Sequence, residues 1–321
     1  MTPTLRTVLR RVAPFAVSAA ILFYYLRALD WAALWVIAKR VDLPLAVAAV
    51  AVPQLVHWVL GALLIQRTLC WFHGPFDFRP LFWVCGASNI LGFVNGALSG
   101  GGQLLYQQRR AGITWTKLLG VLLFRTGLGL WGIGLAMIPA TFAIHYYGLA
   151  GRVRLNLWVW WGVLIFGVYW LVEAWINWHH DKVFGLSAVV ARNREHEFWS
   201  AFRNARPRHW FLTWLMLAPQ ALVTLVGYHL LNRAFGIHAP VIETFVVLPL
   251  TLAVMDLPVA FAGFGTATLA WTTFFGAYGS PNDIGALTLF LPMSRILCRT
   301  VIGVLSLRPA LPEIEYLLRA R

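Results

Sequence analysis

Long apolar runs separated by short polar segments dominate the hydrophobic pattern of the chain. About 20 consecutive apolar residues are enough to cross the roughly 30 Å hydrocarbon core of a bilayer as an α-helix. The pattern predicts an all-α integral membrane protein with about six transmembrane helices. We place these spans at residues 11–29, 44–65, 118–138, 157–177, 210–230 and 284–305.

Three segments next to these spans are predicted to lie at the membrane surface. The segment 30–40, DWAALWVIAKR, is too short to cross a bilayer, and Trp31 and Trp35 are one helical turn apart. Tryptophans with this spacing are typical of a helix in the membrane interface. Residues 66–80 are predicted to form a loop, and residues 306–321 a short interfacial tail.

Two further regions are only partly apolar, and each is interrupted by a glycine-containing break. Residues 81–116 contain NGALSGGGQ, and residues 240–279 contain DLPVAFAGFG. A helix can break inside a bilayer where protein or water satisfies the freed backbone groups. We predict two re-entrant or broken-helix hairpins with SGGG and AGFG at their tips, where the glycines line a pathway; close helix packing is the alternative role. The glycines are Gly100, Gly101, Gly102, Gly263 and Gly265.

The composition supports a membrane protein and argues against a soluble enzyme domain. The 321 residues are 60% hydrophobic and 12% charged, with a mean hydropathy of +0.69. The longest polar segment, the basic loop 179–209, is too short to bury a core of its own. We therefore interpret residues 1–321 as a single polytopic membrane domain.

The basic residues indicate how the chain is oriented. The net charge of +14 arises at segment ends beside apolar runs, which favours anionic membrane lipids over nucleic acid as partners. With the N-terminus in the cytoplasm, 17 of the 26 Lys and Arg residues fall inside, six outside and three within spans. This distribution predicts a multi-pass protein of the cell (cytoplasmic) membrane with both termini cytoplasmic. The two hairpins then enter from opposite faces, as in an inverted repeat.

Arginines within the spans are the strongest candidates for chemistry. Arg125, Arg295 and Arg299 each cost at least about 2.5 kcal/mol to insert, so we expect them to face protein or a water-filled cavity. One role is to bind a lipid phosphate together with helix ends at the hairpins. The alternatives are packing ion pairs and extension of the side chain to the headgroups. The acids available for such pairs are Glu173, Glu243 and Asp256.

Small polar side chains beside the hairpin tips are candidates for hydrogen bonds to a headgroup. Gln103 and Thr268 are the main ones, although such residues also satisfy neighbouring backbone groups. His57 is isolated in its apolar run, and His179 and His180 are adjacent, which does not suit one metal ion. The sequence therefore predicts no metal, no cofactor and no catalytic residue.

The order of these motifs resembles a known family. The segment DWAALW, the glycine-rich break followed by paired arginines, and the late stretch LPVAFAGFGTATLAWTTFFGAYGSPNDIGALTLFLPMSRIL resemble the flippase-like transmembrane domain of lysylphosphatidylglycerol synthases. That domain also occurs in stand-alone membrane proteins without the synthase domain. The resemblance covers nearly the whole chain and implies lipid translocation between leaflets.

The resemblance also shows where this chain departs from the family pattern. Family members carry a GGLGE-like stretch with a following arginine in the first hairpin, where this chain has Gln103 and Tyr106. In the second hairpin, Ala267 and Thr268 replace an Arg-Glu pair. The glycines, the nearby Arg110 and the downstream Arg125 and Arg295 are the matching positions that remain.

From these features we expect a flippase-like protein that binds and moves a phospholipid or lipid-linked compound. Such a protein would not be an enzyme. Two alternatives are a non-transporting scaffold or regulator of an envelope complex, which the basic loop would suit, and a membrane-embedded lipid-modifying enzyme.

Overall fold

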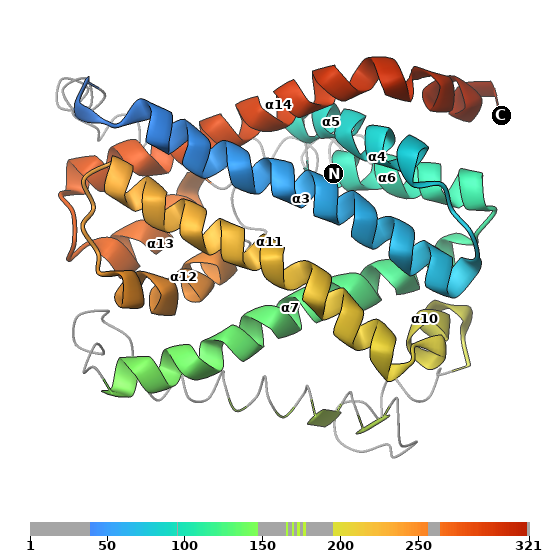
Figure 1. The fold of residues 1–321 in the computed structure, drawn as a ribbon, viewed down its shortest axis with the longest axis horizontal. Helices are drawn as coiled ribbons and strands as arrows, with labels where there is room; N and C mark the ends of the chain where they lie inside the picture. Colours follow the sequence, from blue (N-terminus) through green and yellow to red (C-terminus); the bar gives the residue numbers. More distant parts are fainter. Residues whose placement is uncertain are drawn as a thin grey trace, which may run out of the picture. The chain divides into compact units, whose positions relative to one another are not determined.

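The computed structural model describes residues 39–94, 96–146, 165, 169, 172–173, 176–177, 195–255 and 264–319. Within these residues every element is an α-helix or a short 3-10 helix (Figure 1). The all-α class is therefore confirmed. The predicted span 11–29, the interfacial helix up to residue 38, most of the span 157–177 and the break at 256–263 lie outside the described residues.

Four long helices, α3 (Leu43–His73), α7 (Trp115–Tyr146), α11 (Pro207–Ala234) and α14 (Pro281–Arg319), dominate the fold. At 1.5 Å per residue, the 31 residues of α3 extend about 46 Å, which exceeds the bilayer core. In the described part of the chain, α3, α11 and the stretch Pro281–Leu317 of α14 are long and apolar enough to cross a membrane. The number of crossings in the whole chain stays a prediction.

The predicted loop at 66–80 and the predicted tail after 305 are both wrong in part. Helix α3 continues to His73, because residues 66–73 contain no glycine or proline. It ends at Gly74, whose φ of +106° suits the residue that follows a helix, and Pro75 comes next. Helix α14 continues to Arg319, and α6 (Gly96–Ala111) binds its last turns: Arg109 Nη1 donates a 2.6 Å hydrogen bond to the Leu317 carbonyl.

The described chain divides into two compact units, and each contains one pair of packed short helices. The first unit comprises Met1–Val50, Phe142–Leu155 and Leu225–Arg295, and the second comprises Ala51–Thr141, Asn156–Thr224 and Ile296–Arg321. The assignment of residues 1–321 to one membrane domain stays a prediction.

The second unit is built around the short helices α4 (Phe78–Ala87), α5 (Asn89–Val94) and α6 (Gly96–Ala111). They pack with parts of α3, α7 and α14 around an apolar core. Its buried members include Ile65, Leu69, Leu81, Val84, Tyr106, Leu118 and Ala310. A neighbouring aromatic cluster joins α7 to α10 (Ser200–Asn204) and α11 through Phe124, Phe202 and Trp210, after the 3-10 helix η1 (Glu197–Trp199).

Glycines let α14 approach α4 and α5 closely in this unit. A Cβ atom added at Gly86 of α4 would lie 2.1 Å from Ser306 Oγ. A Cβ added at Gly303 of α14 would lie 2.5 Å from Ile90 Cγ1 and 3.0 Å from its backbone nitrogen. Small residues at helix crossings are a common packing device in membranes. Helix α14 therefore holds its position against the hairpin through these two glycines.

The glycine-rich break of the first hairpin differs from the prediction. We predicted that SGGG forms the tip, but Gly100, Gly101 and Gly102 lie inside helix α6. Helix α5 ends at Val94, and α6 begins at Gly96, several residues before this run of glycines. An added Cβ at Gly102 would meet Leu91 Cδ1 at 3.0 Å, so this glycine allows α5 and α6 to pack closely. The packing of α6 on α5 thus stabilises a helix that contains three consecutive glycines.

The first unit contains the second pair of short helices, α12 (Val241–Met255) and α13 (Phe264–Phe275), which flank the sequence break. Buried Trp271 donates a 2.7 Å hydrogen bond from Nε1 to Asn232 Oδ1. Ser280 caps the start of α14, since its Oγ accepts a hydrogen bond from the Asp283 backbone at 3.1 Å. Arg40 also pairs with Asp283, which ties the chain before α3 to α14.

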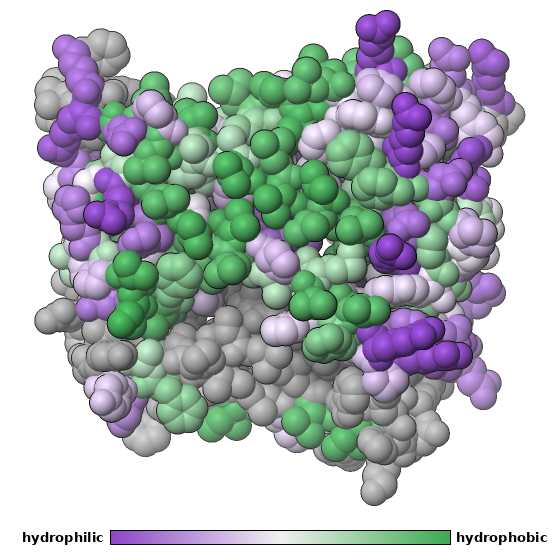
Figure 2. Space-filling model, viewed as in Figure 1, coloured by the Kyte–Doolittle hydropathy of each residue, from purple (hydrophilic) through white to green (hydrophobic). Residues whose placement is uncertain are grey.

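Apolar side chains cover much of the outer surface of the described helices. Leu297 of α14 is 65% exposed and Leu222 of α11 is 55% exposed. Figure 2 shows many hydrophobic side chains on the visible face, with hydrophilic side chains mainly toward its left and right edges. This distribution is expected where lipid tails contact the middle of a helix and headgroups contact its ends.

Candidate functional site

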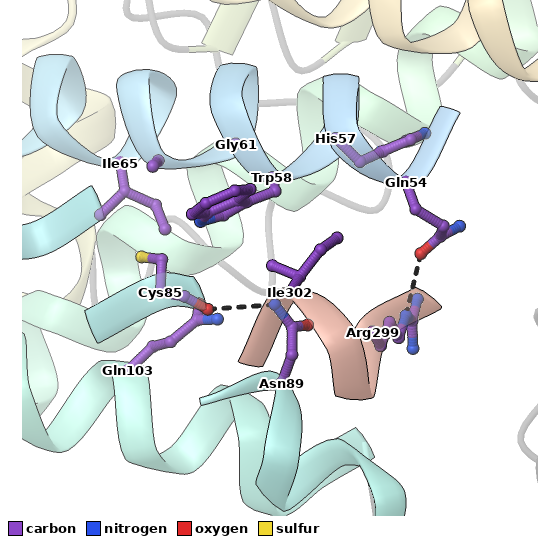
Figure 3. A pocket seen from close by; sticks show the side chains of 11 residues that line it. Gln54, His57, Trp58, Gly61, Ile65, Cys85, Asn89, Gln103, Arg299 and Ile302 are labelled. Atoms are coloured by element: carbon purple, nitrogen blue, oxygen red, sulfur yellow. Dashed lines mark hydrogen bonds between the residues drawn. The ribbon is translucent and has the colours of Figure 1, made fainter. Parts of the chain in front are cut away.

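A cavity of about 150 Å³ lies within the second unit, between α3 on one side and α4, α5, α6 and α14 on the other (Figure 3). This cavity, which we call the α3–α14 pocket, is large enough for several water molecules. Its described lining residues are Gln54, His57, Trp58, Gly61, Ala62, Ile65, Cys85, Asn89, Gln103, Arg299 and Ile302.

Helix α3 presents one continuous face to the pocket. Gln54, His57, Trp58 and Gly61 lie at positions i, i+3, i+4 and i+7, which share one side of an α-helix. Figure 3 shows the Gln54 side chain pointing from α3 toward Arg299. A polar stripe in this part of α3 therefore borders the pocket, with Gln54 half-buried and His57 exposed.

Trp58 forms a fixed wall of the pocket. Its ring stacks on Phe82 with centroids 4.3 Å apart, and its Nε1 donates a 3.1 Å hydrogen bond to the Phe82 carbonyl. Gly61, one turn further along α3, leaves space beside the indole, because nothing lies within 4 Å of an added Cβ. His57 is anchored to α11 by a 2.8 Å hydrogen bond between its Nε2 and Thr224 Oγ1.

An amide network lines the opposite wall. Gln103 Nε2 on α6 donates to Ser88 Oγ at 2.8 Å. Ser88 Oγ in turn donates to the Cys85 carbonyl at 2.8 Å, and Asn89 Nδ2 donates to the same carbonyl at 3.3 Å (Figure 3). The Cys85 carbonyl at the end of α4 thus receives two side-chain hydrogen bonds. These bonds hold Asn89 and Gln103 in fixed positions at the pocket.

Arg299 supplies the positive charge of the pocket. Its Nε donates a 3.1 Å hydrogen bond to Oε1 of Gln54, so α3 orients the guanidinium from across the pocket (Figure 3). None of the described lining residues is acidic. The lining therefore combines one guanidinium with three amides and an imidazole, which is suited to an anion or to neutral polar groups.

Arg125 lies close to this pocket without lining it. The half-buried Arg125 of α7 is within electrostatic range of the Cys85 thiol. Among the described residues it makes no hydrogen bond and no ion pair. Arg125 therefore adds positive potential on the Cys85 side of the pocket.

Arg110 has a different environment from the one expected for a pathway residue. It lies two turns, or about 10 Å, beyond Gln103 on α6. Its Nε is 3.8 Å from a Glu313 oxygen, and its guanidinium lies 5.2 Å from the Tyr316 ring centre. Tyr106 also donates a 3.2 Å hydrogen bond to Glu313. Arg110 thus joins α6 to the last turns of α14, and a role in a pathway stays a prediction.

The remaining candidates belong to the first unit. Arg295 is half-buried on α14, and its side chain makes no ion pair with a described residue. Gly265 and the half-buried Thr268 are in α13, whereas Gly263 lies outside the described residues. Their role as site residues stays a prediction.

Among the described residues, no ion pair joins Arg125 or Arg295 to one of the predicted acids. Glu243 accepts a hydrogen bond from Tyr278, and Glu173 is fully buried in the second unit. Asp256 lies outside the described residues. The packing pairs considered for Arg125 and Arg295 are thus not seen among the residues that the structure describes.

The pocket brings Gln103 and Arg299 together, and both were candidates from the sequence alone. The sequence reasoning missed Gln54, His57 and Asn89, and it treated His57 as isolated. The available signal was the helical spacing of Gln54, His57 and Trp58 inside an apolar run. That spacing indicates a shared face, but the sequence does not show which helix the face contacts.

Apolar helices long enough to span a bilayer, with a polar pocket beside them, define an α-helical integral membrane protein. A family model described as the lysylphosphatidylglycerol synthase TM region matches residues 11–297. The chain belongs to this family of membrane proteins, which is linked to lipid metabolism. No curated protein and no solved structure matches the chain.

Proposed function

We propose that this protein is a flippase-like lipid translocator of the cell (cytoplasmic) membrane with both termini in the cytoplasm. It binds the headgroup of a phospholipid or lipid-linked compound in the α3–α14 pocket while the acyl chains remain in lipid. The protein moves its substrate without changing it chemically, so no catalytic step is assigned.

The observation that carries this proposal is a polar pocket behind lipid-compatible helix surfaces. On α14, Arg299 and Ile302 line the pocket, whereas Leu297 and Val301 are 65% and 49% exposed. The same helix thus offers a charged group to a headgroup and an apolar surface to a tail. A lipid is a molecule with both parts.

The energetics of a polar pocket in a membrane support an occupant. Polar groups withdrawn from water cost roughly 1–3 kcal/mol each when they lack hydrogen-bond partners. Gln54, Asn89 and Gln103 each use only part of their hydrogen-bonding capacity within the described structure. Water or a polar headgroup would satisfy the rest. Movement of a headgroup through such a pocket lowers the barrier to crossing the hydrocarbon core.

The test is transbilayer movement of fluorescent phospholipids in proteoliposomes that contain the full chain. We expect Arg299→Ala to slow movement about tenfold, because the loss of one charge-assisted hydrogen bond is worth about 1.5–3 kcal/mol. Arg308→Ala on the exposed side of α14 is the matched control and should move lipid at the wild-type rate.

Two results would contradict the proposal. Equal rates in protein-containing and protein-free vesicles for every phospholipid would favour the scaffold or regulator. A change in lipid mass after incubation would favour a lipid-modifying enzyme. Mass spectrometry of the extracted lipids therefore accompanies the transport assay.

A further inference from the structure

The first unit contains a group of buried polar atoms that the proposed function does not use. They belong to His229 and Asn232 of α11, which contact α12 and α13. We infer that His229 is a proton-binding site within the membrane and that a proton gradient drives the lipid movement. The coupling rests on the proposed function and deepens it by naming its energy source, whereas the proton site stands on its own contacts.

His229 is an imidazole without a hydrogen bond in an apolar helix. The residue is 9% exposed, and α11 is apolar and long enough to cross a membrane. Its Nδ1 is enclosed and has no hydrogen-bond partner among the described residues. In the tautomer that carries the proton on Nε2, Nδ1 is an acceptor. Because histidine changes charge near neutral pH and ionisable residues within a span form proton relays, Nδ1 is available to take up a proton.

Asn232 offers a second unsatisfied group one turn away. Its Oδ1 accepts a 2.7 Å hydrogen bond from Trp271 Nε1, which fixes the orientation of the amide. Its Nδ2 is buried and has no hydrogen-bond partner in the described structure. Residues three apart on a helix are neighbours, so one water molecule bonded to Asn232 Nδ2 can donate to His229 Nδ1. Such a water gives the neutral imidazole a partner and can pass a proton to it.

Helix α12 supplies an acceptor for the charged imidazole. The ring centroids of Phe245 and His229 are 6.4 Å apart. Pro249, one turn further on the same side of α12, has no N–H, so the Phe245 carbonyl lacks the donor that a regular α-helix provides. A protonated imidazole has two N–H groups and needs such acceptors. The site therefore offers hydrogen-bonding groups to both charge states of His229.

Among the described residues, no carboxylate holds the imidazole in one charge state. Helix α13 has no titratable residue. The titratable or charged side chains on α11, α12 and α14 in this unit are Tyr228, Arg233, Glu243, Asp283 and Arg295. Arg233 lies within electrostatic range of His229, and the two carboxylates bond to other groups and form no ion pair with it. A proton held by neutral groups is released more readily than one held by an ion pair, so uptake at His229 is reversible.

The contacts around His229 explain how a proton can act on the fold. Its ring contacts α12, and Asn232 holds α13 through Trp271. These two helices pack against each other and flank the sequence break at 256–263. A charge that appears on His229 changes the energy of both contacts, so proton uptake shifts the balance between two arrangements of the unit. A proton gradient then favours lipid movement in one direction.

Protonation is measured by nuclear magnetic resonance of the full chain in detergent micelles, with ¹⁵N-labelled histidine. The chain has nine histidines, and His229→Gln identifies the signal of interest by its loss. We expect this signal to change reversibly from neutral to protonated imidazole between about pH 8 and about pH 4. Pro249→Ala restores an N–H to the Phe245 carbonyl and should lower the midpoint of this change by about one pH unit. The control His238→Gln, at an exposed position of the same unit, should leave the midpoint unchanged.

Coupling is measured by transbilayer movement of fluorescent phospholipids in proteoliposomes, with and without a pH gradient. For the wild type and His238→Gln we expect movement to be about fivefold faster with the gradient in one direction. His229→Gln should show equal rates with and without the gradient. Where that variant does not fold, Pro249→Ala provides the test, because its response to the gradient should require a pH about one unit lower.

Each outcome supports or overturns one part of the inference. A His229 signal that stays neutral throughout overturns the proton site. An unchanged midpoint in Pro249→Ala overturns the role of the Phe245 carbonyl. Titration of His229 with no effect of the gradient, or an effect that persists in His229→Gln, overturns the coupling. Absence of lipid movement in every condition overturns the proposed function and its coupling, while the resonance measurement still decides the proton site.

Discussion

The Nε of Arg299 donates a 3.1 Å hydrogen bond to Oε1 of Gln54, which is 245 positions earlier in the chain. This contact joins α3 to α14 across the pocket and fixes the direction of the guanidinium. A charged group that is fixed in this way needs little reorganisation when it binds an anion. The pair therefore links stability and ligand binding in a way that can be measured.

We expect Gln54→Leu and Arg299→Leu to be non-additive in their effects on the free energy of unfolding. Because each variant removes the same hydrogen bond, the double variant should be less destabilised than the sum by about 0.5–2 kcal/mol. Reversible unfolding in mixed detergent micelles measures this coupling. Additivity within about 0.3 kcal/mol would show that the contact contributes nothing.

Filling the pocket is expected to block lipid movement without unfolding the protein. A Leu side chain at Gly61 would occupy space where nothing lies within 4 Å of an added Cβ. We expect Gly61→Leu to reduce lipid movement about tenfold or more and to preserve the unfolding transition. Gly127→Leu in α7, also without neighbours within 4 Å, is the control for bulk and should retain transport. Equal loss in both variants would contradict a specific pocket.

Alanine variants at two glycines of α6 distinguish a packing role from a pathway role for these residues. Nothing lies within 4 Å of a Cβ added at Gly100 or Gly101. Alanine at each should stabilise α6 by about 0.5–1 kcal/mol, because glycine weakens a helix interior. Unfolding and transport are measured together on the same variants. Stabilisation with unchanged transport would remove both glycines from the predicted pathway, and stabilisation with lost transport would place them on it.

Close contacts at α14 predict that alanine at two other glycines lowers the stability of the protein, whereas alanine at Gly100 or Gly101 raises it. Gly86→Ala would bring a Cβ within 2.1 Å of Ser306 Oγ, and Gly303→Ala would approach the Ile90 backbone. Forced overpacking of this kind costs about 1–3 kcal/mol. We expect each variant to lower the midpoint of thermal unfolding, as followed by circular dichroism. A midpoint equal to that of the wild type would indicate that α14 is free to shift.

The hydrophobic pattern was sufficient to predict the helical class and the central part of each described span. Helix ends were harder to place, because α3 and α14 extend beyond their apolar segments through polar and aromatic residues. A hydropathy pattern reports which residues can enter lipid. It does not report where backbone hydrogen bonding stops, which at α3 is set by Gly74 and Pro75.

The pocket could be predicted only in part, for a physical reason. Gln103 and Arg299 are conspicuous as polar residues near a break or inside a span, so each was a candidate by itself. Gln54 and His57 can be recognised as pocket residues only from their contacts with α14 and α11. Those contacts join residues 245 and 167 positions apart, and no local pattern in a single sequence specifies such a pairing.

The sequence analysis placed the glycine run at a hairpin tip because it considered the composition of the segment and not its packing in the fold. Three consecutive glycines weaken an isolated helix, which is why they indicated a tip. In the fold, Gly102 provides the room that Leu91 needs at the α5–α6 contact. Packing thus overcomes the intrinsic preference of the residues.

The two hydrogen bonds that converge on the Cys85 carbonyl also bear on how this protein can evolve. The codons for glutamine and glutamate differ at the first base only, so one point mutation is enough to exchange the residue at Gln103. Because Asn89 alone can keep the carbonyl satisfied, such a mutation need not pass through an unfolded intermediate. The scaffold that holds the pocket would therefore stay the same while the side chain at this position changes.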